Sequence, residues 1–96
     1  MIAAKPVTSR PKMRNDLQQT DLKDGCVLYD REKEMTYTLN ITASLIWSYL
    51  DGNLSMEEIA EEIISLGSSD KNAIWQDILH TINFLEQNRL LERGSV

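Results

Sequence analysis

The fold is decided by the stretch TLNITASLIWSYLDG, Thr38–Gly52. It continues an alternating run, residues 35–39, which predicts a β-strand that ends at Asn40. Asn40 and Thr42 are both suitable N-caps, because their side-chain oxygens can accept hydrogen bonds from the free N–H groups at a helix start. Gly52 ends the helix, where a residue with positive φ is needed. The sequence therefore predicts a strand that turns directly into a short amphipathic helix.

Two further helices follow this stretch. One begins at Ser55, because Glu58 three residues later gives the capping-box spacing, and it ends at Gly67. Its expected apolar side consists of Met56, Ile59, Ala60, Ile63 and Leu66. The other is expected over about Lys71–Asn88, after the polar run 68–70. Its central apolar stripe, at helical spacing, consists of Ile74, Ile78, Ile82 and Leu85.

The residues before the deciding stretch predict a small antiparallel sheet. Cys26–Tyr29 and Glu34–Leu39 are rich in β-favouring residues, and the polar residues 30–33 join them as a hairpin. A first edge strand is expected over 11–17, with 18–23 as a polar connection. The fold class is therefore α+β, a winged helix-turn-helix-like arrangement in which a two- or three-stranded antiparallel sheet precedes three helices.

Length and composition fit one small domain. The chain has 96 residues, 42% of them hydrophobic, which suffices for a single core over 11–91 between tails at 1–10 and 92–96. The single cysteine cannot form an intramolecular disulfide, and no apolar run is long enough to span a membrane. We therefore expect a soluble cytoplasmic protein.

The charge distribution argues against nucleic acid as a partner. The net charge is −5, although residues 1–14 carry four basic side chains and no acidic one. Binding to phosphates needs a basic face, and the third helix offers only Lys71 and, at its end, Arg89. A winged-helix DNA-binding regulator is therefore the weaker alternative.

No catalytic or metal-binding constellation stands out in the sequence. Cys26 and His80 are the only residues of their types, so a tetrahedral zinc site lacks ligands. Cys26, in a short apolar strand, is expected in the core, and His80 on the polar side of the third helix. The four glycines are scattered and form no phosphate-binding loop. We expect neither enzyme activity nor a cofactor.

Several short motifs follow one another at regular spacing through the chain. They are Asp24–Asp30 (DGCVLYD), Leu39-Asn40, Thr42-Ala43, Ile46-Trp47, Leu50–Gly52, Ser55, Glu58–Ala60, Asp77-Ile78, Ile82, Leu85 and Leu90-Leu91. In their order and spacing they resemble the PqqD-like family, small domains also called RiPP recognition elements. One position departs from the pattern, because Arg89 stands where the family often has glycine. We expect Asn88 to take the left-handed conformation instead.

The resemblance implies a peptide-binding site. In this family the leader of a precursor peptide adds as a strand to the third strand of the sheet and packs against the third helix. By position, the pairing backbone would be that of Glu34, Met35, Thr36, Tyr37 and Thr38. The expected lining from the third helix is Trp75 and Leu79, with Ile78 as the floor and Ile82 next to it. For Ile78 and Ile82, a place in the core stripe is the stronger interpretation.

Two questions about the third helix stay open at this point. Its apolar stripe has one edge with Trp75 and Leu79 and another with Thr81 and Phe84. The first edge is favoured, because a tryptophan at the margin of a core suits a peptide pocket. An equally good interpretation of Trp75 is that it covers the junction between the helix and the hairpin.

The implied function is that of a non-catalytic adaptor, which binds the leader of a precursor peptide and raises its concentration at a modifying enzyme. That enzyme would be a radical SAM protein, a leader peptidase or a cyclase. The resemblance points to pathways that make pyrroloquinoline quinone or lasso peptides. A further alternative is an assembly module that dimerises through the same edge strand. We expect a monomer or weak homodimer, with no nucleic-acid or membrane partner.

Overall fold

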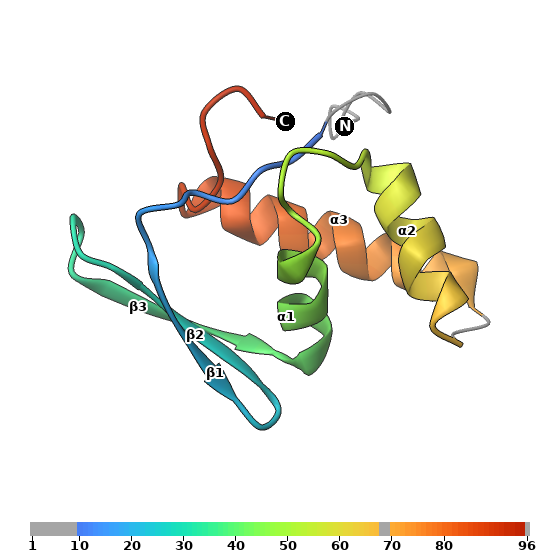
Figure 1. Ribbon diagram of the computed structural model, residues 1–96, viewed down its shortest axis with the longest axis horizontal. Helices are drawn as coiled ribbons and strands as arrows, with labels where there is room; N and C mark the ends of the chain where they lie inside the picture. The colour runs from blue at the N-terminus through green and yellow to red at the C-terminus, as the bar shows by residue number, and fades with distance from the viewer. Residues whose placement is uncertain (1–9, 68–69, 96) are drawn as a thin grey trace.

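A computed structural model describes residues 10–67 and 70–95. It contains three strands and then three helices: β1 (Gln18–Leu22), β2 (Gly25–Asp30), β3 (Met35–Asn40), α1 (Ile41–Ser48), α2 (Met56–Ser65) and α3 (Lys71–Gln87). The strands form one antiparallel sheet in the order β1-β2-β3 (Figure 1). The fold class expected from the sequence is therefore confirmed. The expected tail at 1–10 lies, except for Arg10, outside the described residues.

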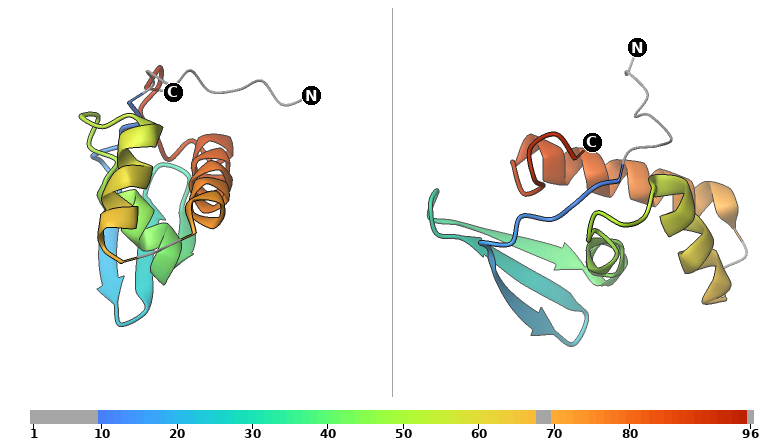
Figure 2. Two further views of the ribbon diagram at one scale, coloured as in Figure 1. Left: turned by 90° about the vertical axis from the view of Figure 1, so that its right-hand side faces the viewer. Right: turned by 45° about the horizontal axis from the view of Figure 1, so that its top comes forward.

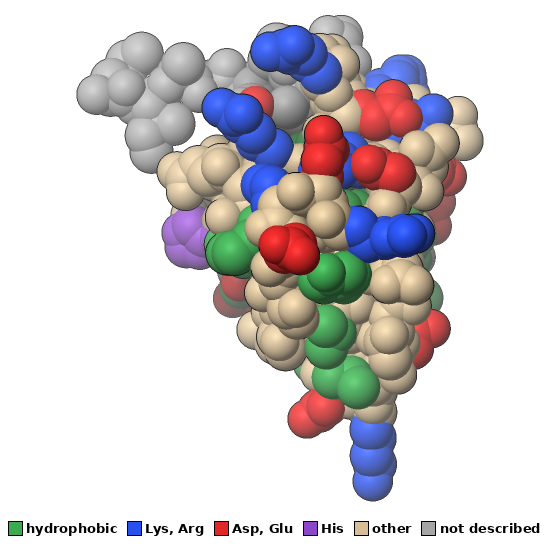
Figure 3. All heavy atoms as spheres, turned by 90° about the vertical axis from the view of Figure 1, so that its left-hand side faces the viewer, with side chains coloured by type: hydrophobic (Ala, Val, Ile, Leu, Met, Phe, Trp, Pro, Cys, Tyr) green, Lys and Arg blue, Asp and Glu red, His purple; other side chains and the backbone are tan. Residues whose placement is uncertain are grey.

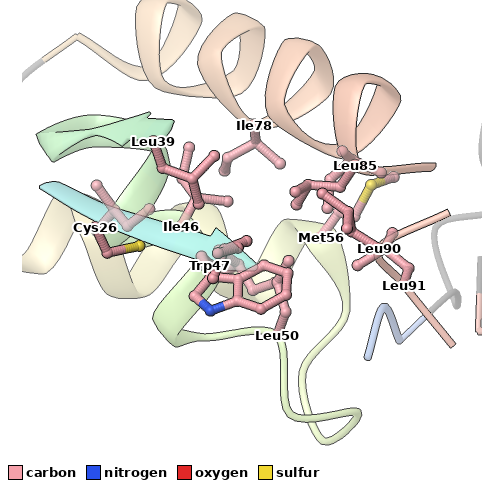
Figure 4. Close-up of a cluster of buried hydrophobic side chains, with 14 of the residues drawn as sticks. Cys26, Leu39, Ile46, Trp47, Leu50, Met56, Ile78, Leu85, Leu90 and Leu91 are labelled. Atoms are coloured by element: carbon pink, nitrogen blue, oxygen red, sulfur yellow. The ribbon is translucent and has the colours of Figure 1, made fainter. Parts of the chain in front are cut away.

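α1 packs against one face of the sheet, and α3 packs against α1 and α2. Figure 1 and the right-hand view of Figure 2 show α1 between the sheet and α2, while α3 lies across both helices. The alternation of β2 and β3 turns Cys26, Leu28, Tyr37 and Leu39 inward, and all four are buried. Figure 4 shows several of these side chains meeting those of α1 and α3. This shared core fixes α3 beside the sheet.

Trp47 lies deep in this core. Its side chain is 2% exposed, and its Nε1–H donates to the Gln19 side-chain oxygen at 2.9 Å. The hydrogen bond joins α1 to β1 and satisfies the buried indole donor. Cys26 is fully buried, as the sequence predicts.

The predicted position of the first strand is wrong. β1 occupies the residues expected to form a polar connection, and all five of its side chains are exposed. It therefore lacks the alternation of apolar and polar side chains by which a half-buried strand is recognised. Backbone pairing with β2 holds the strand in place. The segment predicted as a strand instead makes two isolated bridges, Lys12 with Asp51 and Met13 with Leu91. The chain before β1 thus runs between the end of α1 and the residues after α3.

Each helix begins at a side-chain cap. Asn40, rather than Thr42, caps α1, and its Oδ1 accepts from the Ala43 N–H at 2.8 Å. Ser55 and Glu58 form the predicted capping box at α2, with both reciprocal hydrogen bonds present. The Ser55 N–H bond lowers the pKa of Glu58.

The end of α2 corrects a further expectation. Leu66, predicted on its apolar side, lies beyond the last helical residue and is 64% exposed. The buried residues of α2 therefore end at Ile63, and the partly buried Ile64 also packs against the core.

Removal of the α2 cap gives a first prediction. We expect Ser55→Ala to lower the free energy of unfolding by about 1 kcal/mol, because the Glu58 N–H loses its acceptor. Urea denaturation followed by circular dichroism measures this change. Ser65→Ala is the matched control, since its hydroxyl bonds an exposed carbonyl at the other end of α2. An equal loss in the two variants would contradict a specific role for the cap.

The end of α3 corrects the expectation for Asn88. Its φ is −95°, and Arg89 takes the left-handed conformation itself, with φ 57°. The Arg89 N–H donates to the Glu86 carbonyl at 3.1 Å and the Leu90 N–H to the Leu85 carbonyl at 2.9 Å. These two bonds form a Schellman motif, and the fully buried Leu85 and Leu90 supply its hydrophobic contact. Tertiary contacts thus hold a non-glycine residue where glycine is usual.

A buried ion pair connects this helix end to the sheet. Asp30, at the end of β2, is 1% exposed, and its Oδ2 lies 2.8 Å from the Arg14 Nη1. Arg14 also pairs with Asp16 at 2.7 Å and donates to the Arg89 carbonyl at 2.9 Å. The hydrogen bonds from Arg14 lower the pKa of both aspartates, while they raise the pKa of Arg14. One guanidinium therefore joins the N-terminal segment, β2 and the end of α3.

Candidate peptide-binding groove

β3 forms one edge of the sheet, so one side of its backbone has no strand partner among residues 10–67 and 70–95. A groove of about 210 Å³ lies between this strand and α3. Its lining consists of Thr38, Leu39, Asn40, Ala43, His80, Thr81 and Phe84. Figure 3 shows the only histidine at the margin of the sheet side of the molecule, next to hydrophobic side chains. An unpaired strand edge beside a partly apolar groove is the arrangement that accepts an added peptide strand.

Aromatic contacts fix the distance between β3 and α3. The rings of Tyr37 and Phe84 meet edge to face, with centroids 6.2 Å apart and an interplanar angle of 81°. The Lys33 ammonium lies 5.5 Å from the centroid of the Tyr37 ring and also donates to the Asn88 carbonyl. The turn between β2 and β3 is thus fastened to the end of α3. Because Phe84 is 41% exposed, its remaining surface is free to contact a peptide.

The structure places four of the five predicted backbone residues in this edge strand. Glu34 belongs to the turn before β3 and has a φ of 55°, so the strand begins at Met35. Thr36 and Thr38 are exposed, whereas Tyr37 is buried and reaches the core. The strand edge therefore covers Met35–Asn40, one residue later than the strand predicted at Glu34–Leu39.

The two edges of α3 are now distinguishable. Ile78 and Ile82 are fully buried, so they belong to the core beneath the groove. Trp75 and Leu79 are half-buried against the core, and neither lines the groove. At 3.6 residues per turn, Trp75 and Phe84 lie on roughly opposite sides of the helix. The edge that faces β3 is therefore the one with Thr81 and Phe84.

His80 is a groove residue that the sequence did not indicate. Its position on the polar side of α3 predicts only exposure to solvent, which the structure confirms. It lines the groove because this side of the helix stands over the end of β3. Only the distance between Phe84 and Tyr37, which are far apart in the sequence, reveals that orientation.

Another hollow lies apart from this groove. It measures about 600 Å³ and lies beside the segment after α3, and the Arg14 in its wall is already engaged by Asp16 and Asp30. Among the residues that the structure describes, no three histidine, cysteine or acidic side chains gather as metal ligands. Across the same residues, no helix has the length and apolar character that crossing a membrane requires.

Known proteins resemble this chain in family and in fold. The chain matches the family model for PqqD, coenzyme PQQ synthesis protein D, over residues 25–91. A solved structure of TbiB1 in complex with the TbiA(beta) leader peptide is 25% identical, with a TM-score of 0.74 over 88% of this chain and 99% of that one. A lasso peptide synthetase B1 complexed with its leader peptide is 23% identical and shares the fold, with a TM-score of 0.73 over 86% of this chain and 98% of that one.

A third structure comes from Methylobacterium extorquens. It is the PqqD truncation of PqqCD, described as a functional and stand-alone recognition element for ribosomally synthesised and post-translationally modified peptides. Identity is 25% and the TM-score 0.74, over 94% of this chain and 96% of that one. A comparison with curated protein sequences gives no match. The family model covers well over half of the chain, and the chain therefore belongs to the PqqD family.

Proposed function

We propose that this protein is a non-catalytic adaptor that binds the leader of a ribosomally made precursor peptide and presents it to a modifying enzyme. The leader adds as a strand to β3, along Met35–Asn40. Its side chains on one face enter the groove against α3, where Thr81 and Phe84 form the wall. Raising the local concentration of the attached core peptide is then sufficient to assist the enzyme.

One observation carries this proposal: the unpaired edge of β3 lies directly beside the groove. Backbone pairing supplies affinity for many leader sequences, while the groove supplies preference for side chains at alternate positions. The similarity to TbiB1, whose structure contains a leader peptide, supports the same assignment. The enzyme would be of the radical SAM, leader peptidase or cyclase class.

The charge of the helices favours a peptide over DNA. In a winged-helix DNA reader, the helix pair presents basic side chains to the phosphates. Here the exposed side of α2 carries Glu57, Glu58, Glu61 and Glu62 and no lysine or arginine. Those four carboxylates would repel a DNA backbone.

Hydrogen exchange tests strand addition directly. The probe is a synthetic peptide with the leader sequence of the precursor encoded beside this chain. In an antiparallel sheet only alternate amides of an edge strand point away from its partner. We therefore expect every second amide of Met35–Asn40 to exchange about tenfold more slowly, or slower still, when the peptide is bound. Uniform protection of all six amides, or none, would contradict strand addition.

A pair of variants tests the groove. We expect Phe84→Ala to weaken leader binding about tenfold, because a partly exposed aromatic wall of the groove is removed. Trp75→Ala is the matched control, since Trp75 lies on the opposite flank of the same helix, and it should change the affinity less than about twofold. Isothermal titration calorimetry measures both. A larger loss of leader affinity for Trp75→Ala than for Phe84→Ala would show that the peptide binds at the Trp75 edge of α3 instead.

A further inference from the structure

A second apolar hollow lies at the opposite side of the sheet. It measures about 320 Å³ and lies between the β1–β2 turn and the exposed side of α1. Leu22, Ile41 and Leu45 line it, and their side chains are 46%, 64% and 36% exposed. They are three of the six large hydrophobic side chains that the described residues leave exposed. Half of these six side chains are therefore gathered at a place that the leader groove does not use; we call it the α1 hollow.

The α1 hollow adjoins the other free edge of the sheet. β1 is the outer strand on this side, and all five of its side chains are exposed. The described part of the chain supplies no further strand to cover its backbone N–H and C=O groups. Within β1 there is no proline and no lysine, the residues that commonly block such an edge. An open strand edge and an apolar hollow therefore occur together here, as they do at β3.

The extent of this surface argues against a second copy of the chain. Stable homodimers usually bury more than about 2,000 Å² in largely apolar interfaces. The surface here consists of one five-residue strand and three apolar side chains, with polar Asp21, Ser44 and Ser48 around them. This extent suits a transient contact with a different protein.

The charge of the same surface points in the same direction. Asp21 and Asp24 flank the single Lys23 at the end of β1. Asp21 is the only charged side chain within β1, and a second β1 strand would offer it no lysine or arginine. A strand that carries lysine or arginine next to an apolar side chain complements the edge better.

We propose that the β1 edge and the α1 hollow together form the docking site for the modifying enzyme, which adds an extended, basic segment to β1 and inserts an apolar side chain between Leu22, Ile41 and Leu45. The inference rests on the proposed adaptor function, because an adaptor must hold leader and enzyme at once. Two strand spacings, roughly 10 Å, separate β1 from β3, so both edges can be occupied together.

The first turn of α1 separates the two sites. Asn40 and Ala43 line the leader groove, whereas Ile41 and Ser44 line the α1 hollow. An enzyme docked at the hollow therefore stands next to the Asn40 end of the bound leader. This position shortens the path between the recognised leader and the active site that receives the core peptide.

The test compares two equally exposed apolar residues. Ile41 and Leu66 are both 64% exposed, but only Ile41 lines the α1 hollow. The probe is the purified modifying enzyme encoded beside this chain, with the leader peptide present. We expect Ile41→Lys to weaken enzyme binding about tenfold and Leu66→Lys to leave it within about twofold. Leader affinity, measured separately on each variant, should stay at the wild-type value.

The outcomes separate this proposal from its alternatives. Unchanged enzyme binding by Ile41→Lys would overturn it, and so would failure of the wild-type protein to bind the enzyme at all. A concentration-dependent dimer in sedimentation that Ile41→Lys abolishes would assign the surface to a second copy and also overturn it. Failure of the wild-type protein to bind the leader peptide would instead overturn the proposed adaptor function. The two failures are distinguishable, because leader affinity is measured without the enzyme and does not depend on the α1 hollow.

Discussion

Gly25→Ala is expected to unfold the protein or to lower its free energy of unfolding by more than about 3 kcal/mol. Gly25 opens β2 with a φ of 153°, a conformation that other residues rarely adopt. A Cβ atom at this position would stand 2.0 Å from the Leu39 carbonyl oxygen, which belongs to the backbone of the neighbouring strand. Neither strand can yield without opening the β2–β3 ladder, because Gly25 pairs with Asn40. Thermal melting followed by circular dichroism measures the loss.

Gly67→Ala is the matched control for this variant. Gly67 also has a positive φ, 115°, but an added Cβ meets no atom within 4 Å. It should cost only the backbone strain, about 1 to 2 kcal/mol. The difference between the two variants isolates the steric contact with β3. If both lose the same stability, the close approach at Gly25 is not the cause.

The second large effect is expected for Arg14→Met. The substitution keeps the apolar stem of the side chain but removes the guanidinium from Asp30, which is 1% exposed and retains only Lys33, whose Nζ lies 3.6 Å from its Oδ2. A buried charge that loses its partner is far more costly than a surface ion pair that is broken. We expect the melting temperature to fall by roughly 10 °C or more. Arg10→Met is the matched control, because Arg10 and Glu58 form an ion pair in which both side chains are about half exposed.

The same variant should change how stability depends on pH. Hydrogen bonds from Arg14 lower the pKa of Asp30 and Asp16 in the folded protein. A lowered carboxyl pKa stabilises the fold at pH values above the unfolded pKa of about 4, and this stabilisation is lost as the pH falls through the folded value. The wild type should therefore lose stability steeply below about pH 4, and Arg14→Met should show a shallower decline. Parallel pH curves would contradict this account of the network.

Features that depend on neighbouring residues were predicted correctly from the sequence, whereas features that depend on distant residues were not. The caps at Asn40 and Ser55 and the strand that passes into α1 follow from residues that lie close together in the chain, and the structure contains all three. β1 escaped detection because its side chains are exposed on both faces, so no alternation marks it. A strand that is held only by backbone hydrogen bonds needs no particular sequence of side chains, so the sequence does not reveal it.

The sequence by itself determined the three helices, the β2–β3 hairpin and the apolar stripe of α3, since these depend on periodicity and on caps within one element. It also carried enough motif spacing to indicate the PqqD family. Only the tertiary structure decided which edge of α3 faces β3, because a stripe of buried residues leaves both of its margins equivalent. The contact of Tyr37 with Phe84 turns the Phe84 margin of α3 toward β3. The hydrogen bonds of Arg14 to Asp30 and to the Arg89 carbonyl hold the end of β2 near the end of α3. These contacts join residues far apart in the chain, so they arise from packing and not from local pattern.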